Sequence, residues 1–568
     1  MNLTLVAILG VVSIVAVTAF SKKLGLAAPL ALVVVGIVLS FVPGTPDVEI
    51  DPELILAGVL PPLLYSSAVD MPSQDFRRNL KAISSLAVLL VILTTLGMGW
   101  MFHTILPGVG WPAAFALGAV ISPTDAVAAT SIGKKLGLPP RVVTMLEGEG
   151  LVNDASSLVL LRSAVAAIAS SVSIWQVAGS FVRSVVIAVI VGVVVGEAAV
   201  RLRALLRDPV LGTAVSFVVP FVAFLPAEEL DASGVLAVVV TGLVVGRLGP
   251  RRIAARDRWL ESMNWRTIAF LMESAIFLIM GLEVKPLVDA VQRSDNSLSE
   301  ALWVGLLASA AVVALRLVFV VPLVGAIRQD QQRAAGNRSK FENWQDNPRF
   351  NELEVSERRL QRMSDRVERV VADLDFKVTE AIGWRSAVVL GWAGMRGAIT
   401  VAAAQTLPLD TPRREELVLI AFVVAVVTLL AQGLTLPLVI RKAGIRDDSA
   451  QRVQQETHDV VSDLYAAGFR ELDELERTAS EEDRSTLAEI RHDLERERDE
   501  MGARADLVAR DARHDYSRLR LDVLAAQRNA LNSLADRGAY GSPAINAATR
   551  MLDGFEVRLT SFDDDSSA

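Results

Sequence analysis

Long apolar runs follow one another through most of the chain. From Met1 to about Leu438 the apolar runs are about 17 to 25 residues long, enough to cross roughly 30 Å of hydrocarbon as helices. The pattern predicts an all-α polytopic membrane protein with about thirteen transmembrane helices. The predicted spans are centred near Ile14, Val34, Leu60, Leu90, Val120, Leu160, Ile190, Val218, Val239, Ile276, Val313, Ala398 and Val426.

The apolar runs stop near residue 440, and this change predicts two domains. Residues 1–440 form a transmembrane domain that contains a polar insertion at 328–383, and residues 441–568 form a helical C-terminal domain on the cytoplasmic side. Apolar residues recur at helical spacing in both polar regions. In the insertion they are Leu353, Leu360, Met363, Val367, Val370, Val371 and Leu374; in the tail they include Leu507, Leu519, Leu521, Leu524, Leu531 and Leu534.

The sequence leaves the roles of both polar regions open. The amphipathic stretch of the insertion suits the bilayer surface, the tail, or a second copy of the chain. A regulatory or dimerising tail and a passive solubilising tail fit the same pattern.

Loop charges give the orientation. Basic and non-basic connections alternate along the chain. The basic set includes the connections with Lys22 and Lys23, Arg77 and Arg78, Lys134 and Lys135, and Arg201, Arg203 and Arg207; the connections between them are mostly acidic or neutral. By the positive-inside rule the basic set is cytoplasmic, so the N-terminus lies outside and the tail inside. The first run has no basic residue ahead of it and two lysines behind it, so it reads as a span rather than a secretory signal. The expected location is the plasma membrane.

Composition excludes several classes of function. The chain is 52% hydrophobic and 21% charged, has a net charge of -8, and contains no cysteine. Disulfides and cysteine-ligated metals are therefore excluded, and the charge offers no basic footprint for nucleic acid. We find no catalytic or nucleotide-binding motif, so we expect neither an enzyme nor a resident cofactor.

A carboxylate lies inside one apolar span. Asp154 follows Glu149-Gly150-Leu151-Val152-Asn153 and precedes the apolar run from Leu158 to Ile168. An ionised group at a helix centre costs roughly 2.5 to 3.5 kcal/mol, so such a residue faces a protein-lined or watery cavity and binds something positive. Asp154 therefore indicates transport of a cation and a proton that compete for one carboxylate. A structural partner of an arginine is the alternative.

Two spans are interrupted at equivalent places. Thirteen spans permit two inverted six-helix repeats and a linker, and such folds place the ion site where corresponding helices break. The fifth span contains Ser122-Pro123-Thr124-Asp125, and the fifth of the second half contains Gly391, Gly394, Arg396 and Gly397. Proline lacks an N–H and glycine weakens a helix interior, so freed backbone groups need neighbours, water or a cation.

Four motifs together resemble one family. Ser122-Pro123-Thr124-Asp125-Ala126, Glu149 to Asp154, Gly391 to Ala398 and Gln432-Gly433-Leu434-Thr435-Leu436-Pro437 are similar, in this order, to the monovalent cation/proton antiporters of the sodium/proton exchanger type. The closest likeness is to bacterial members with a helical cytoplasmic tail. The resemblance implies the antiporter fold with crossing broken helices, a homodimer, a scaffold domain and a mobile core that carries the ion.

The resemblance also assigns residues. It implies that Asp154 carries Na+ or H+, that Asn153 is its uncharged neighbour in electroneutral one-for-one exchange, and that Asp125 and the Thr124 carbonyl lie at the helix crossing. Glu149 and Arg396 match a structural ion pair. For Asp125 the alternative is a cap on a half-helix N-terminus. The span charges Glu273 and Arg316 are secondary candidates that pair or line a cavity.

Two positions depart from the family pattern and leave the transported ion open. Ser66 follows Pro61-Pro62-Leu63-Leu64-Tyr65 where relatives often carry Glu, so Ser66 stays a secondary candidate. Gly150 replaces a serine that is a ligand in some members. Na+ is the expected ion, K+ and Li+ are alternatives, and the expected role is pH and sodium homeostasis. The rival functions are a cation channel and a non-transporting membrane scaffold for the tail.

Overall fold

The computed structural model describes residues 3–24, 27–43, 51–169, 174–206, 208–294, 297–345, 370–371, 373–378, 380–445, 449–478 and 481–506. The chain divides into two compact units, Met1–Ile445 and Arg446–Ala568. Within the described residues both units are helical and no strand occurs, which confirms the predicted all-α class. The helix α18 ends at Ala443, three residues beyond the predicted boundary at 440.

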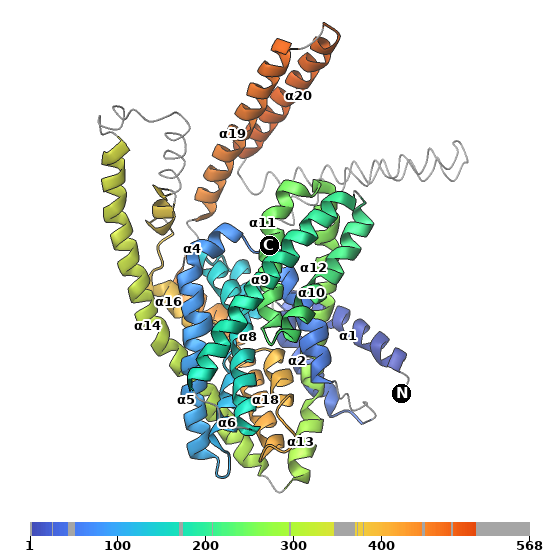
Figure 1. Cartoon of the computed structure of the whole chain (residues 1–568), viewed down its shortest axis with the longest axis vertical. Helices are drawn as coiled ribbons and strands as arrows, with labels where there is room; N and C mark the ends of the chain where they lie inside the picture. The colour runs from blue at the N-terminus through green and yellow to red at the C-terminus, as the bar shows by residue number, and fades with distance from the viewer. Residues whose placement is uncertain are drawn as a thin grey trace, which may run out of the picture. The chain divides into compact units, whose positions relative to one another are not determined.

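The first unit contains nearly all of the helices (Figure 1). They are α1 (Leu3–Leu24), α2 (Ala28–Ser40), α3 (Leu60–Asp70), α4 (Ser73–Ser84), α5 (Leu90–Ile105), α6 (Trp111–Val120), α7 (Ala126–Lys135), α8 (Pro140–Ala169), α9 (Ile174–Leu206), α10 (Pro209–Glu229), α11 (Gly234–Arg252), α12 (Ala255–Leu282), α13 (Val284–Arg293), α14 (Leu298–Gln345), α16 (Trp384–Trp392), α17 (Ala398–Gln405) and α18 (Arg414–Ala443). The π-helical turns Leu54–Val59 and Ser85–Leu89 lead into α3 and α5.

Each predicted span centre lies in a helix of the first unit. By length and apolar composition, eight helical segments of the described chain are able to cross a membrane, and four further apolar helices are shorter. One of the shorter apolar helices, Trp111–Val120, is half of a broken span. The number thirteen therefore stays a prediction, while the polytopic helical fold is confirmed.

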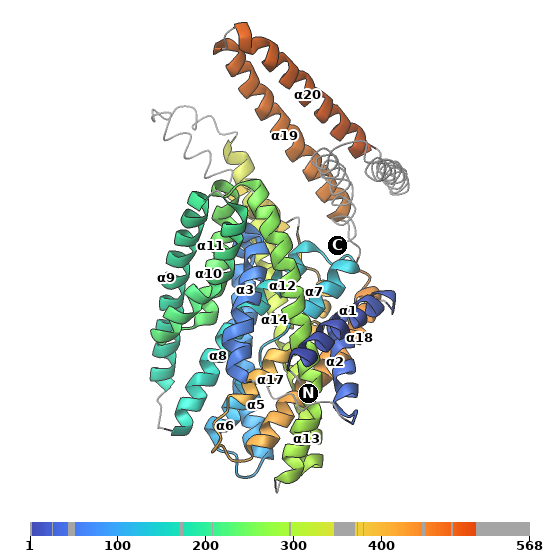
Figure 2. The ribbon, with the colours of Figure 1, turned by 90° about the vertical axis from the view of Figure 1, so that its right-hand side faces the viewer.

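The helices of the first unit pack as two groups. The core bundle consists of α4 to α8, α14, α16, α17 and α18, which contact one another extensively. The scaffold bundle consists of α3 and α9 to α12, with α2 packed on α12 and α1 on α2. Figure 2 shows α9, α10 and α11 side by side on one flank. The two bundles meet along a seam where α8, α4 and α17 touch α11, α9 and α12.

Glycine allows the scaffold helices to approach closely. A Cβ atom on Gly246 of α11 would lie 2.4 Å from the Val69 carbonyl oxygen of α3, and one on Gly36 of α2 would lie 2.5 Å from the Leu278 carbonyl oxygen of α12. Small residues at such contacts let membrane helices gain van der Waals packing that larger side chains would prevent.

Two core spans are broken, as the sequence predicts. The chain leaves helical geometry between α6 and α7 at residues 121–125 and between α16 and α17 at residues 393–397. The breaks touch, because the Asp125 N–H donates to the Met395 carbonyl oxygen at 2.7 Å. Proline and glycine at these places make an uninterrupted helix unfavourable. Each broken span supplies two half-helices whose ends point into the core bundle.

The polar regions are mostly helical where they are described. The predicted insertion begins inside α14, which runs 48 residues to Gln345. Of its amphipathic positions, only Val370, Val371 and Leu374 are among the described residues. In the tail, α19 (Ser449–Thr478) and α20 (Glu481–Asp506) form a hairpin in which Arg491 binds Glu476 at 3.0 Å and Asp473 at 2.6 Å. The predicted tail positions from Leu507 onward lie outside the described residues.

Candidate functional site

The middle of α8 lies beside the crossing of the two broken spans. It carries Asn153 and Asp154, which are 1% and 6% exposed. Within the described part of the chain, no hydrogen bond or ion pair reaches the Asp154 carboxylate. A buried carboxylate without a partner is costly when ionised, so this side chain requires a proton or a bound cation.

Asn153 and Thr124 link α8 to the first break. The Asn153 Nδ2 donates to Thr124 Oγ1 at 2.9 Å and to the Thr124 carbonyl oxygen at 3.3 Å. Thr124 Oγ1 in turn donates to Glu149 Oε1 at 3.0 Å. These bonds leave the Asn153 Oδ1 buried and without a hydrogen-bond partner in the described structure. An unused amide oxygen next to an unpaired carboxylate is a suitable donor set for a hard monovalent cation.

The structure corrects the predicted ion pair of Glu149 with Arg396. Glu149 instead pairs with Arg316 of α14: Nη2 lies 2.8 Å from Oε2, and Nη1 bonds Oε1. Arg316 also donates to the Leu390 carbonyl oxygen at 3.1 and 3.2 Å. The glycine at 394 makes room for this arginine, because a Cβ there would lie 2.4 Å from the Arg316 Cδ.

Arg396 serves the broken backbone. Its Nε donates to the Ile121 carbonyl oxygen at 3.0 Å, and its Nη1 donates to the Gly394 carbonyl oxygen. One guanidinium therefore binds carbonyl groups freed at both breaks. Carbonyl groups without a helical partner inside a membrane need hydrogen-bond donors, and Arg396 lies at the break and supplies them. For this reason Arg396 does not pair with Glu149.

Asp125 caps a half-helix. Its Oδ1 accepts a hydrogen bond from the Val127 N–H at 2.9 Å, which makes it the N-cap of α7. This bears out the capping alternative for its carboxylate. The other carboxylate oxygen lies against Gly397, where a Cβ would come within 2.8 Å of it. Asp125 is close enough to Asp154 that its charge acts on that carboxylate.

The structure places the three secondary site candidates differently. Arg316 belongs to the Glu149 pair. Glu273 of α12 brings a third carboxylate near the crossing, since the Asp125 charge acts on it and its Oε1 is buried without a partner in the described residues. Ser66 is buried in α3 of the scaffold bundle, and no hydrogen bond joins it to the Asp154 cluster in the described part of the chain.

Sequence reasoning missed a buried pair in the scaffold bundle. Arg203, which the sequence places among loop charges, lies 2% exposed at its side chain and bonds Glu261 of α12. The neighbouring Trp265 donates to Ser216 at 3.0 Å and packs against Tyr65 with ring centroids 5.3 Å apart. Arg203 lies in the same helix as the apolar run before it, α9 (Ile174–Leu206). A helix predicted to continue past that run would have placed Arg203 beside the neighbouring helices.

The donor set at the crossing suits a transported monovalent ion. Among the described residues, no group of three or more His, Asp or Glu side chains is arranged to hold a metal ion. Carboxylate, amide and backbone oxygens at a break in a membrane helix are the ligands that secondary transporters offer to Na+ and H+. Fold and site together define a polytopic membrane transporter.

Comparisons with known proteins agree with this class. Residues 10–442 match the family described as sodium/hydrogen exchanger, transmembrane, and the chain belongs to that family. It is 30% identical to an uncharacterised Na+/H+ exchanger of Mycobacterium bovis over 98% of this chain and 96% of the relative. It is 28% identical to the Na+/H+ antiporter ApNhaP of Aphanothece halophytica over 78% of this chain and 74% of that one.

A more distant relative and a solved structure complete the comparison. The chain is 25% identical to the sodium, potassium, lithium and rubidium/H+ antiporter of Bacillus subtilis, over 93% of this chain and 74% of the relative. The fold is similar to that of the sodium proton antiporter MjNhaP1 from Methanocaldococcus jannaschii. That match has a TM-score of 0.55 and 15% identity, and it covers 77% of this chain and 97% of the other.

Proposed function

We propose that this protein exchanges one Na+ for one H+ across the plasma membrane and that both ions bind at Asp154. The observation that carries the proposal is the buried Asp154 carboxylate, which has no hydrogen-bond or ion-pair partner among the described residues. Glu149, one helical turn and a residue before it on α8, is paired with Arg316. Asp154 is thus the carboxylate of α8 whose charge is left for a mobile ion.

Competition for Asp154 gives coupling without a further device. The empty, ionised site bears the desolvation cost of a bare carboxylate, while the Na+-loaded and protonated forms do not. If the core bundle changes sides only in the neutralised forms, each cycle moves one Na+ one way and one H+ the other. Asn153 adds an oxygen ligand but no second negative charge, which suits electroneutral exchange.

The proposed Na+ ligands are oxygens from α8 and from the first break. Asp154 provides the charge, and the Asn153 Oδ1 and the Thr124 carbonyl provide neutral oxygens. The Asp125 charge acts on both Asp154 and Glu273, and negative charge gathered near the crossing would favour a bound cation there. K+ and Li+ compete for the same ligands.

The assignment of sides rests on basic residues. The ends of α7, α9, α11 and α18 that carry Lys134, Arg203, Arg252 and Arg441 would be cytoplasmic by the positive-inside rule. The tail would then be cytoplasmic and the N-terminus outside. We further propose the homodimer expected from the family resemblance and a role in pH and sodium homeostasis.

Proton flux in reconstituted vesicles tests the proposal. Na+, K+ or Li+ is added to proteoliposomes that contain a pH-sensitive dye, with the native protein and with Asp154→Asn. We expect proton movement on addition of Na+ that Asp154→Asn abolishes. Asp231→Asn is the matched control, because Asp231 is 85% exposed at its side chain and its backbone conformation suits asparagine.

The rival functions give different results in the same vesicles. A channel gives a cation current that follows voltage and needs no counter-proton. A scaffold gives no cation-dependent proton movement in either protein. Normal exchange by Asp154→Asn would contradict the assignment of the ion site.

A further inference from the structure

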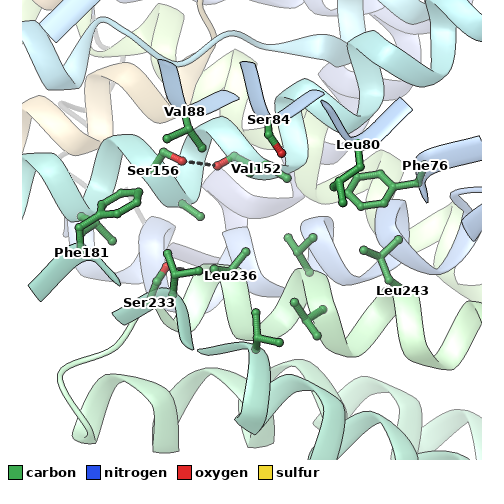
Figure 3. Close-up of a pocket in the computed structure, with 16 residues that line it drawn as sticks. Phe76, Leu80, Ser84, Val88, Val152, Ser156, Phe181, Ser233, Leu236 and Leu243 are labelled. Atoms are coloured by element: carbon green, nitrogen blue, oxygen red, sulfur yellow. Dashed lines mark hydrogen bonds between the residues drawn. The ribbon is translucent and has the colours of Figure 1, made fainter. Parts of the chain in front are cut away.

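A cavity of about 290 Å³ lies in the seam between the two bundles (Figure 3). One wall comes from the core bundle, where Phe76, Leu80, Ser84 and Val88 follow one another along α4 and the turn after it. The facing wall comes from α11 and α9 of the scaffold bundle. We call this cavity the seam crevice.

The walls of the seam crevice resemble hydrocarbon. Apart from three serines, its lining is aliphatic or phenyl. The Ser156 hydroxyl donates to the Val152 carbonyl oxygen at 3.1 Å, and the Ser233 hydroxyl accepts from the Leu236 N–H at 3.2 Å, so both are used by their own helices. A cavity with so few free polar groups does not hold ordered water well and suits an apolar occupant.

The seam crevice opens to the side of the protein. Ala155 and Val239 at its floor are 3% and 1% exposed, whereas Leu80 and Val189 at its rim are 46% and 39% exposed. The helices that form it are long and apolar enough to cross a membrane. In a bilayer the open rim therefore faces lipid rather than water.

The length of the seam crevice matches one leaflet. Its wall on α11 extends from Ser233 to Leu243, and ten residues of helix rise about 15 Å. That is about half of the roughly 30 Å hydrocarbon core, the depth that the acyl chains of one leaflet fill. Phe76 and Leu243 lie at the same end in Figure 3, with Val88 and Ser233 towards the other.

The Phe76 end is flanked by arginines. Arg77 follows Phe76, is 62% exposed at its side chain, and lies 3.8 Å from the Asp373 carboxylate, which is a long ion-pair distance. Arg247 is exposed on α11 four residues after Leu243, which places it on the same helix face one turn further out. Two exposed arginines beside an apolar slot are complementary to an anionic headgroup.

We propose that the seam crevice binds an acyl chain of an anionic phospholipid, with its headgroup at Arg77 and Arg247. Val152 and Ala155 line the cavity and flank Asn153 and Asp154 along α8. A lipid chain there fills the seam between the bundle that carries the ion site and the bundle that packs against it. This inference does not depend on which ions the protein transports.

Photolabelling with lipid tests the proposal directly. The native protein is reconstituted in phosphatidylcholine vesicles with a small fraction of phosphatidylglycerol that carries a diazirine on its acyl chain. After illumination, adducts are mapped by mass spectrometry. We expect adducts concentrated on the α8 and α11 peptides that line the crevice, and several-fold weaker labelling there with the matching phosphatidylcholine probe.

Filling and charge variants give the controls. Ser84→Phe and Val88→Phe add bulk inside the crevice and should each reduce these adducts, whereas Leu96→Phe on the exposed face of α5 should not. Arg77→Gln with Arg247→Gln should remove the preference for phosphatidylglycerol, and Lys442→Gln at the end of α18 should preserve it.

Two results would overturn the proposal. Adducts spread evenly over all lipid-facing helices, unchanged in both filling variants, would show that no chain is bound in the crevice. Equal labelling of the crevice by the two headgroup probes would refute the role of the arginines. Elution of each variant from size-exclusion chromatography at the native volume confirms that it is folded, so a loss of adducts reports on the crevice.

Discussion

The core and scaffold bundles differ in how their buried charged and polar groups are paired. In the core bundle two spans are broken, Arg316 pairs with Glu149, and Arg396 donates to carbonyl groups freed at the breaks. Asp154 has no partner in the described part of the chain. In the scaffold bundle α9 to α12 cross without a break of this kind, and glycine contacts bring their backbones together. Its buried Arg203 pairs with Glu261, whereas Glu273 of α12, near the crossing, has a buried Oε1 without a partner in the described residues.

The difference separates stability from transport. Charges that are paired within one bundle hold that bundle together, whereas the unpaired carboxylate adds cost to the empty state and is useful only with an ion. We therefore expect substitutions at the paired charges to affect folding, and substitutions at Asp154 to affect exchange with little loss of stability.

The largest expected effect is at the Glu149–Arg316 pair. Glu149→Gln leaves the Arg316 charge buried without its counter-charge, and breaking a buried pair in this way costs about 3 to 5 kcal/mol. Thermal unfolding of purified protein in detergent should show a large fall in the midpoint temperature. Asp154→Asn, a similar change of carboxylate to amide on the same helix, should show none.

A second variant separates the pair from its surroundings. Glu149→Gln combined with Arg316→Met removes both charges and should recover part of the lost stability, since an uncharged pair has no bare charge to desolvate. The Leu390 carbonyl oxygen then loses its donor, so recovery should be incomplete. If Glu149→Gln is as stable as the native protein, the view that this pair holds the core bundle together is wrong.

The next largest effect is expected at the close contact between α11 and α3 in the scaffold bundle. Gly246→Ala would place a Cβ 2.4 Å from the Val69 carbonyl oxygen and force α11 away from α3. Overpacking of this kind costs about 1 to 3 kcal/mol. Gly179→Ala in α9 is the matched control, because a Cβ there meets nothing within 4 Å and alanine favours a helix.

Both glycine variants are measured by thermal unfolding and by proton flux. Gly246→Ala should lower the midpoint temperature, and Gly179→Ala should leave it unchanged or raise it slightly. Equal midpoints for the two variants would mean that the close contact of α11 with α3 contributes nothing to the scaffold bundle.

The pH dependence of exchange tests whether the ion site lies in the core bundle. Because Na+ and H+ compete for one carboxylate in the core bundle, lowering the pH fills the site with protons and raises the Na+ concentration needed for half-maximal exchange. In the range where protons occupy most sites, that concentration should rise roughly tenfold per pH unit, about 1.4 kcal/mol. The maximal rate at saturating Na+ should stay nearly constant.

Flux at a series of Na+ concentrations and pH values measures this slope. Asp231→Asn, at the connection of α10 and α11 in the scaffold, should show the native slope. A half-saturating concentration that stays fixed while the maximal rate falls with pH would place the sensing group outside the ion site.

Local sequence signals predicted the breaks and the buried carboxylate correctly. Pro123 and the glycines around Arg396 act on their own backbone, so their effect is visible without tertiary structure. Asp154 is conspicuous because its apolar surroundings are contiguous in the chain. These features of the core bundle needed no knowledge of which helices are neighbours.

The partners of the charges were beyond local reasoning. Arg316 reaches Glu149 from 167 positions away, and nothing in the spacing distinguishes it from Arg396 as a partner. Arg203 was predicted to lie in a loop because the end of a long helix looks the same as a loop by charge alone. The helix α14 continues into the predicted insertion because no proline between Pro322 and Gln345 ends it. The change from apolar to polar residues near Arg328 marks a change of surroundings and does not mark the end of the helix.

The smallest predicted effect concerns the end of the insertion. Phe376 lies against the guanidinium groups of Arg78 and Arg141, whose Cζ atoms are 4.7 and 5.2 Å from the ring centroid. Arg78 also binds Asp373 at 2.8 Å, and Lys377 binds Asp330 of α14 at 3.0 Å. Each of these contacts joins residues 373–377, at the end of the insertion, to α4, α8 or α14; Asp330 itself lies in the part of α14 where the insertion begins.

Replacing Phe376 tests whether the insertion belongs energetically to the core bundle. Phe376→Ala should lower stability by about 1 to 2 kcal/mol, because a cation–π contact at a partly exposed site contributes roughly 0.5 to 1 kcal/mol and some apolar contact is lost as well. Phe376→Leu keeps the apolar contact and should lose about half as much. In Phe376→Ala the peptides of α4 and α8 at Arg78 and Arg141 should exchange amide hydrogen faster, while those of α9 to α11 stay protected. If the peptides of α9 to α11 exchanged faster instead, the end of the insertion would stabilise the scaffold bundle and not the core bundle.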